Sequence, residues 1–190
     1  KKPTAYKFCP NPLNFIHVAN LSSHIDDTVA YVAGVIEELS KIETIWEPSG
    51  KTTVSGFQSL KGMNLFKSPS GKIAQLNSII INELEAYYRK YQHDPCSYMK
   101  KFPSTYDLYG WHVVLKHQGY QNAHIHSSGW LSGVIYLKVV PSLGKDEGAI
   151  EFSLNSEHYH DVNSPKLTLQ PQVGDIVFFP SSLHHRTIPF

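Results

Sequence analysis

Apolar residues recur every three or four positions in two stretches of the first half of the chain. This spacing places them on one stripe of an α-helix, so it predicts amphipathic helices over residues 23–41 and 70–92. A serine caps the first stretch, and Asp94-Pro95 stops the second. Residues 46–58 contain one proline and two glycines, so we expect a loop there with at most one short strand.

From Gly110 onward the apolar positions alternate with polar ones, and β-branched and aromatic residues gather in short runs between turn-forming residues. This pattern is typical of strands. Helices followed by a run of short strands predict a mainly β fold with flanking helices, in which the strands form an antiparallel jelly roll or barrel. The expected strands cover residues 111–117, 132–140, 149–154, 166–170, 175–180 and 186–190.

The length of 190 residues and a hydrophobic content of 41% suit one domain with one good core. We therefore expect a single domain over residues 1–190. Residues 1–109 would supply helical support and outer strands, and residues 110–190 would form the β-barrel core that carries the chemistry.

Charge and composition limit the partners and the compartment. Seventeen basic and sixteen acidic residues leave a net charge of +1, so neither nucleic acid nor an anionic membrane surface is an expected partner. No apolar run is long enough to span a bilayer, and residues 1–12 lack the apolar centre of a signal peptide. We expect a cytoplasmic protein in which Cys9 and Cys96 are free thiols, a bridge between them being the less favoured alternative.

Three histidines carry the candidate chemistry. His124 and His126 stand two residues apart in a turn-rich stretch, so on an extended backbone both side chains lie on the same side. His185 follows the predicted strand that ends at Pro180, and a short turn would return it toward the same mouth of the barrel. Three neutral imidazoles on one face of a divalent metal leave the opposite face open, as in catalytic metal sites.

The other histidines are better explained without a metal. A single histidine is more often a solvated or hydrogen-bonded residue than a ligand. His184 adjoins His185, and neighbours on a strand point to opposite sides. His158 and His160 lie in a polar stretch that could approach the mouth of the barrel.

The motifs around these histidines resemble one branch of the 2-oxoglutarate- and Fe(II)-dependent oxygenases. That branch has His-x-His, then Ser-Gly-x-x-Tyr-Leu, then Phe-Pro-Ser-x-x-x-His-Arg, which correspond here to residues 124–126, 132–137 and 179–186. Residues 46–53 and Gln58 are also similar to the amino-terminal part of the branch, so the resemblance extends from about residue 46 to residue 190.

The resemblance implies a double-stranded β-helix and two cofactors, Fe(II) and the cosubstrate 2-oxoglutarate, which together hydroxylate a C–H bond with dioxygen. The family's usual metal set is two histidines and one carboxylate. His126 stands where that carboxylate is expected, and no Asp or Glu lies within six residues of His124. Either His126 replaces the acid, or two histidines hold the iron and water completes the face.

The distal carboxylate of 2-oxoglutarate needs a hydroxyl group and a cation. Tyr136 matches a position that often supplies the hydroxyl, although a core tyrosine is an equally good explanation. The family's Arg, about ten residues after the distal histidine, would fall beyond Phe190. Arg186 is a poor substitute because it should point away from His185. His117, on the strand before the histidine pair, is a further candidate for cofactor binding.

Two alternatives remain at this point. A cupin-like metal protein shares the barrel, and Gly174, Pro180 and His185 fit its second motif, but the glutamate of its first motif is missing. A barrel without activity, serving as a binding module, would explain both the missing carboxylate and the missing Arg. The sequence names no prime substrate beyond a small molecule or a peptide, and it leaves the oligomeric state open, a dimer included.

Overall fold

The structure is a computed structural model that describes residues 8–141, 144–155 and 161–190. Within these residues the chain is mainly β, with helices in its first half. The helices are η1 (Pro12–Phe15), η2 (Leu21–Ser23), α1 (Thr28–Ser40), α2 (Gly71–Tyr91) and α3 (Ser97–Lys100). The strands are β1 (His17–Asn20), β2 (Thr44–Trp46), β3 (Thr53–Ser59), β4 (Val113–Gln121), β5 (Leu131–Ile135), β6 (Ile150–Ser153), β7 (Lys166–Leu169), β8 (Asp175–Pro180) and β9 (His184–Thr187).

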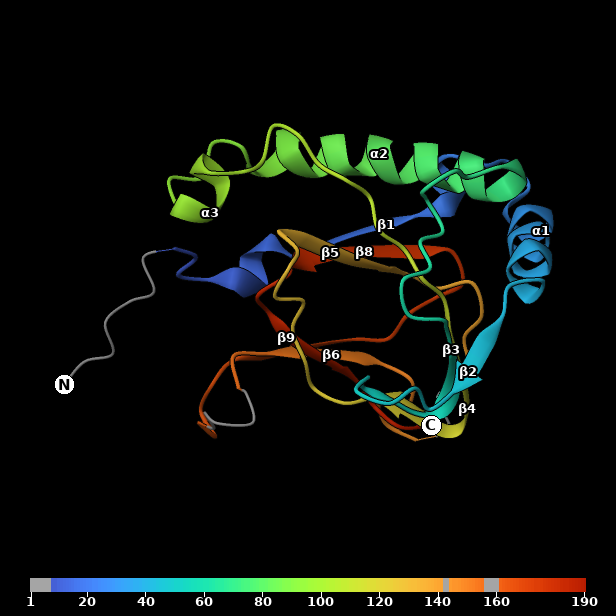
Figure 1. Cartoon of the computed structure of the whole chain (residues 1–190). Coiled ribbons are helices and arrows are strands. Elements are labelled where there is room, and N and C mark those ends of the chain that lie inside the picture. The colour runs from blue at the N-terminus through green and yellow to red at the C-terminus, as the bar shows by residue number, and fades with distance from the viewer. Residues whose placement is uncertain (1–7, 142–143, 156–160) are drawn as a thin grey trace.

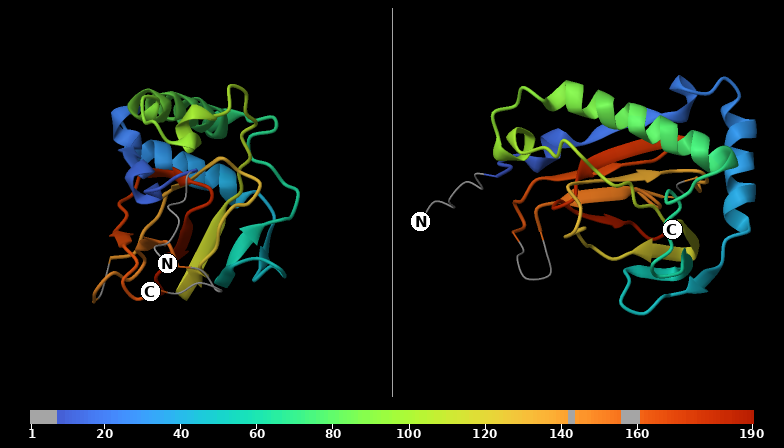
Figure 2. Two further views of the ribbon diagram at one scale, coloured as in Figure 1. Left: turned by 90° about the vertical axis from the view of Figure 1, so that its left-hand side faces the viewer. Right: turned by 45° about the horizontal axis from the view of Figure 1, so that its top comes forward.

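The strands form three antiparallel sheets of three strands each, ordered β1-β8-β5, β2-β3-β4 and β7-β6-β9. Figure 1 shows α2 and α3 lying across one side of the β1-β8-β5 sheet, with β6 and β9 on its other side. The two further views show the same order of helices, central sheet and outer strands (Figure 2). Strand β8 thus lies in the middle layer.

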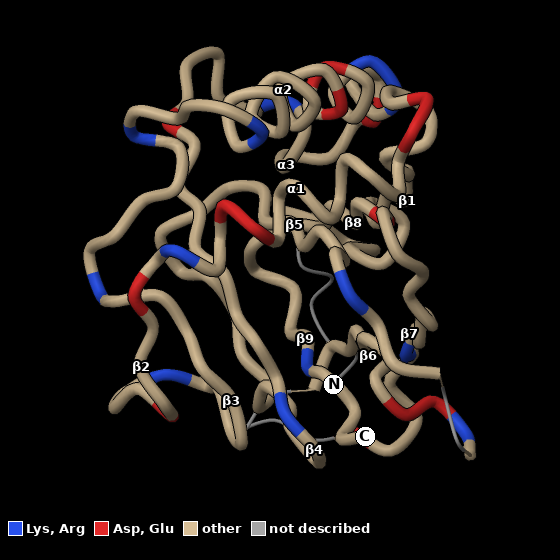
Figure 3. The backbone as a smooth tube through the Cα atoms, turned by 90° about the vertical axis from the view of Figure 1, so that its right-hand side faces the viewer, with Lys and Arg blue, Asp and Glu red and all other residues tan. Residues whose placement is uncertain are grey.

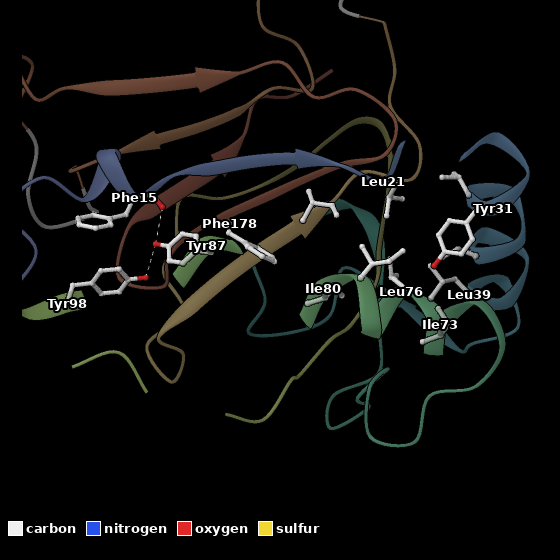
Figure 4. Close-up of a cluster of buried hydrophobic side chains, with 14 of the residues drawn as sticks. Phe15, Leu21, Tyr31, Leu39, Ile73, Leu76, Ile80, Tyr87, Tyr98 and Phe178 are labelled. Carbon is white, nitrogen blue, oxygen red and sulfur yellow. Dashed lines mark hydrogen bonds between the residues drawn. The ribbon is translucent and has the colours of Figure 1, made fainter. Parts of the chain in front are cut away.

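Alternation along β8 divides the interior into two cores. Ile176 and Phe178 pack toward the helices, in a cluster with residues of α1, α2 and η1 (Figure 4). Val177 and Phe179 face the opposite way and pack with Ile150 and other residues of the β7-β6-β9 sheet. Because successive strand residues point to opposite faces, one strand supplies both cores.

Helix α2 carries a buried carboxylate that joins three segments. Glu83 accepts hydrogen bonds from Nε2 of His17 on β1, at 3.2 Å, and from Nε2 of His24 after η2, at 2.6 Å. Glu83 is only 8% exposed. A buried carboxylate is stable only when partners satisfy it, so this cluster fixes α2 against β1.

We expect Glu83→Leu to lower the free energy of unfolding by about 2–4 kcal/mol, because two largely buried histidines lose their acceptor. Urea unfolding followed by circular dichroism measures the change. The matched control is Glu85→Leu on the same helix, whose pair with Arg89 is well exposed, so its loss should cost about 0.5 kcal/mol or less. Equal effects of the two substitutions would contradict this role for Glu83.

Residues 46–58 do not form the expected loop. They contribute the end of β2 and most of β3, which pairs with both β2 and β4. Only the tip of this hairpin, where Lys51 N–H donates to Pro48 C=O, fits the turn signal. Gly56 lies inside the strand at a bulge, where an added Cβ would be 3.0 Å from the carbonyl oxygen of Val114. It therefore marks a close approach of two backbones rather than a turn.

Several predicted boundaries also differ. Helix α1 begins at Thr28, because Asp27 rather than a serine caps it by accepting from Ala30 N–H. Strand β4 begins two residues later than expected and continues through Gln121, which pairs with Thr53. Strand β5 ends at Ile135. Strand β9 covers residues 184–187 rather than 186–190, so His185 lies within a strand.

Charged residues are dispersed over the described surface. Figure 3 shows Lys and Arg positions interspersed with Asp and Glu positions along the chain. None of the helices in the described part is long and apolar enough to cross a membrane.

Candidate metal centre

A pair of backbone hydrogen bonds places His124 opposite His185. His124 N–H donates to His185 C=O at 3.0 Å, and His185 N–H donates to His124 C=O at 3.1 Å. His185 is also fixed from its other side, since it pairs with Phe152 on β6. Two residues paired in this way carry their side chains on the same face of a sheet, so both rings point to one place.

The turn between β8 and β9 positions the third histidine. Ser181 is buried in this turn, and its carbonyl oxygen accepts from His126 N–H at 2.9 Å. Ser181 N–H donates to Trp130 C=O, and its hydroxyl lies 2.7 Å from that of Ser132. Gly129 lies close beside it, since a Cβ there would be 2.7 Å from Ser181 Oγ and would require that hydroxyl to move.

The three rings converge as the spacing predicted. Their centroids are 4.2 Å apart for His124 and His185, and 5.0 Å apart for each of the other two pairs. One nitrogen from each ring lies within 4.8 Å of the other two, so a single metal ion could be held between them. Within the described part of the chain, no carboxylate, thiol or fourth histidine belongs to this group.

Hydrogen bonds select the nitrogen that faces the group in two of the three rings. Nδ1 of His124 lies 2.7 Å from Asn122 C=O, and Nδ1 of His185 lies 3.1 Å from Leu183 C=O. A carbonyl oxygen can only accept, so Nδ1 carries the proton and Nε2 keeps its lone pair. Metal-binding histidines are commonly oriented by such a second hydrogen bond.

Burial keeps the three rings neutral. It lowers the pKa of His185 to about 3, with the charge of His124 adding to the effect. Burial, then His124 and Lys51, lower the pKa of His126 to about 4, and burial lowers the pKa of His124 as well. A neutral imidazole is the form that binds a metal, so the site is ready for an ion at pH 7 without losing protons.

The pH dependence of metal affinity follows from these shifts. Protons compete with the metal only below the pKa of each ligand, and here that competition moves to lower pH. We therefore expect the affinity for Co(II) to stay nearly constant between pH 7 and about pH 5 and to fall below that range, whereas ordinary histidines would weaken it from about pH 6.5. Calorimetric titration at each pH measures this. A tenfold loss between pH 7 and pH 6 would contradict it.

The candidates for cosubstrate binding are placed in different surroundings. Tyr136 follows β5 and packs with the apolar cluster between the two sheets. Burial and the charge of Asp175 raise the pKa of its hydroxyl, which remains a proton donor. Arg186 is bound to Glu151, with Nε 2.8 Å from the carboxylate. His117 is exposed on β4. The roles of all three remain predictions, and His158 and His160 lie outside the described residues.

Two residues near the rings were not assigned a role from the sequence. Trp111 packs edge-on against His126 with a centroid distance of 5.6 Å, yet remains 38% exposed. Lys51 lies at the β2–β3 hairpin, near enough for its charge to lower the pKa of His126. Asn122 N–H donates to the carbonyl of Thr52, the residue after Lys51, and this bond joins the hairpin to the histidine segment. The sequence gives no local signal for the approach of Trp111 or of Lys51 to His126, because each joins segments that are apart in the sequence.

Comparison with known proteins now adds to this geometry. Residues 109–190, which include all three histidines, match the family model described as "Putative 2OG-Fe(II) oxygenase". This part of the chain is similar to the 2OG-Fe(II) oxygenase family. The match favours the oxygenase interpretation over the cupin one, because the matched residues include all three histidines. A search of curated proteins gave no match.

One solved structure shares the fold over most of the chain, and a second is a weaker match. A prolyl-4-hydroxylase from Pseudomonas putida has a TM-score of 0.56 and 12% identity over 92% of this chain and 84% of that chain. The structure titled "The structure of OsALKBH1" has a TM-score of 0.48 and 15% identity, over the same shares of the two chains. The first likeness covers 92% of this chain, so the shared fold extends beyond residues 109–190.

Proposed function

We propose that this protein is an Fe(II)- and 2-oxoglutarate-dependent dioxygenase that hydroxylates a small molecule or a peptide, with His124, His126 and His185 as the iron ligands. The observation that carries the proposal is the convergence of three neutral imidazoles within the residues that match the oxygenase family. The fold inferred for the chain is the double-stranded β-helix, in a single domain whose residues 110–190 form the core.

The donor set fits Fe(II). Imidazole nitrogen is a suitable ligand for iron, and three ligands on one face leave room for other groups on the opposite face. When bound, iron and 2-oxoglutarate would supply the activation of dioxygen and the oxidation of the substrate C–H bond. No carboxylate of the described residues joins the three rings, which favours His126 as the residue that takes its place.

The chain itself contributes position and exclusion of water. The Asn122 and Leu183 carbonyls hold the rings of His124 and His185 in one tautomer. Phe179 packs against His185 with a centroid distance of 4.5 Å, which closes the inner side of the site. The exposed ring of Trp111 leaves His126 bordering the surface, so substrate would enter from that side. A dry inner wall and an open outer side direct the reaction to bound substrate.

Two groups would interact with anions at the open side or inside the barrel. Tyr136, with its protonated hydroxyl, is the candidate donor to the distal carboxylate of 2-oxoglutarate. Lys51 is a cation near His126. Arg186, in contrast, is paired with Glu151. Arg186 is therefore the weaker candidate for an anion.

The activity is tested by mixing the Fe(II) protein, 2-oxoglutarate and dioxygen and measuring succinate. If the proposal holds, the iron-loaded protein should convert 2-oxoglutarate to succinate in proportion to bound iron. The matched control is His185→Ala under the same conditions. No succinate above that control, with iron bound to the wild-type protein, would reject the oxygenase function and support the inactive binding module.

A further inference from the structure

The two cysteines, 87 positions apart in the sequence, lie at the same core cluster. Cys9 precedes η1 and is 7% exposed, and Cys96 lies near enough to raise the pKa of the Cys9 thiol. The backbones of the two segments are joined as well, because Tyr98 N–H donates to Phe8 C=O at 2.8 Å. Cys96 is partly exposed, whereas Cys9 belongs to the core cluster.

Both thiols are free in this structure, and their surroundings set how they can react. Burial, the neighbouring Cys96 and Asp94 raise the pKa of Cys9 to about 12, so Cys9 stays a neutral thiol that reacts slowly with an external oxidant. Burial also raises the pKa of Cys96 and Asp94 adds to this, while the backbone N–H groups of Met99 and Tyr98 act in the opposite direction. The accessible thiol of Cys96 is therefore the one that meets an oxidant first.

We propose that Cys9 and Cys96 form a reversible disulfide, which makes this pair a redox modification site separate from the metal centre. Adjacent thiols, one accessible and one buried beside it, are the arrangement in which a first oxidation at the outer sulfur is resolved by the inner one. Because burial raises the pKa of both thiols, each is a poor leaving group in thiol–disulfide exchange. Reduction of the disulfide should therefore be slow rather than prevented.

The oxidant class is a low-molecular-weight disulfide such as oxidised glutathione. The Cys96 thiolate attacks one sulfur of it, which releases one glutathione thiolate and leaves a mixed disulfide at Cys96. The Cys9 sulfur then attacks Cys96 Sγ, the departing glutathione sulfur takes up the Cys9 proton, and the second glutathione leaves as a thiol. Two protein thiols are oxidised to one disulfide, and one glutathione disulfide is reduced to two thiols.

The site adjoins the support of the metal centre through aromatic packing. The ring of Tyr98 stacks on Trp130 at a centroid distance of 5.8 Å, and Phe8 packs edge-on against Trp130 at 5.4 Å. The Trp130 carbonyl accepts from Ser181, whose own carbonyl accepts from His126. A bridge between residues 9 and 96 would therefore lock the aromatic residues that lie behind Ser181.

The test incubates the metal-free wild-type protein with excess oxidised glutathione and reads the products by mass spectrometry. We expect the loss of two hydrogens without retained glutathione, and one cross-linked peptide pair that contains Cys9 and Cys96. The bridge closes a loop of more than eighty residues, so the melting temperature should rise by roughly 5–10 °C and return after dithiothreitol.

The variants Cys9→Ser and Cys96→Ser show whether the pair acts together. Cys9→Ser should retain glutathione at Cys96 with no rise in melting temperature, and Cys96→Ser should stay largely unmodified because Cys9 is buried. If wild type also retains glutathione at Cys96, or if neither thiol reacts although both react in urea, the proposal is overturned. The wild-type result decides even if a variant fails to fold, and the outcome is independent of oxygenase activity.

Discussion

Replacement of His185 by alanine is expected to abolish iron binding and succinate formation. Loss of a residue that only orients a metal ligand already costs 10–100-fold in metal affinity, so removal of a ligand should cost at least about 100-fold. His185 is also the member of the group with the most burial and with backbone bonds on two sides. Metal-to-protein ratio after dialysis, together with succinate release, measures the effect.

The neighbouring residue provides the control. His184 lies next to His185 on β9 and is less buried, and adjacent strand residues point to opposite faces. His184→Ala should keep iron and activity near the wild-type level. Because His185 packs against Phe179, the stability of metal-free His185→Ala must be measured as well. A folded His185→Ala protein that retains iron as wild type does would remove His185 from the ligand set.

Substitutions of His126 are expected to have the second largest effect and to separate the two ligand models. If three histidines hold the iron, His126→Ala should lower iron affinity by at least about 100-fold. His126→Asp should recover much of that loss, because it restores the two-histidine, one-carboxylate set that suits Fe(II) in oxygenases. Both variants are compared by iron titration under anaerobic conditions and by succinate release.

The opposite result has a definite meaning. Iron affinity and turnover in His126→Ala equal to those of wild type would show that two histidines suffice, with water completing the face. His126 would then lie beside the metal without binding it, in a position fixed by its backbone hydrogen bond to Ser181.

The parts of the fold that local patterns control were predicted well. Helix α2 follows from the helical spacing of its apolar positions, and strand β8 follows from a short, continuous apolar run between turn-forming residues. The convergence of His124 and His126 was likewise a local matter of two residues on an extended backbone. His185 required the motif around Pro180, whose turn brings the chain back to the pair.

The errors and omissions came from contacts between distant segments. The turn signals near Pro48 favoured a loop over strand β3. The pairing of β3 with β4 depends on residues about sixty positions away, so the local sequence does not show it. Residues 21–23, which include the serine expected to cap the first helix, form η2 instead, and Asp27 caps α1. The Glu83 cluster and the meeting of Cys9 with Cys96 each join distant segments, and no local pattern encodes such a meeting.

The most direct test of the central claim is an anaerobic titration of 2-oxoglutarate into the Fe(II) protein, followed in the visible spectrum. If the three imidazoles hold iron with one face open to the cosubstrate, a weak charge-transfer band should grow to saturation at one 2-oxoglutarate per iron, and it should be absent from His185→Ala. An iron-loaded wild-type protein that shows no band at millimolar 2-oxoglutarate would contradict the account.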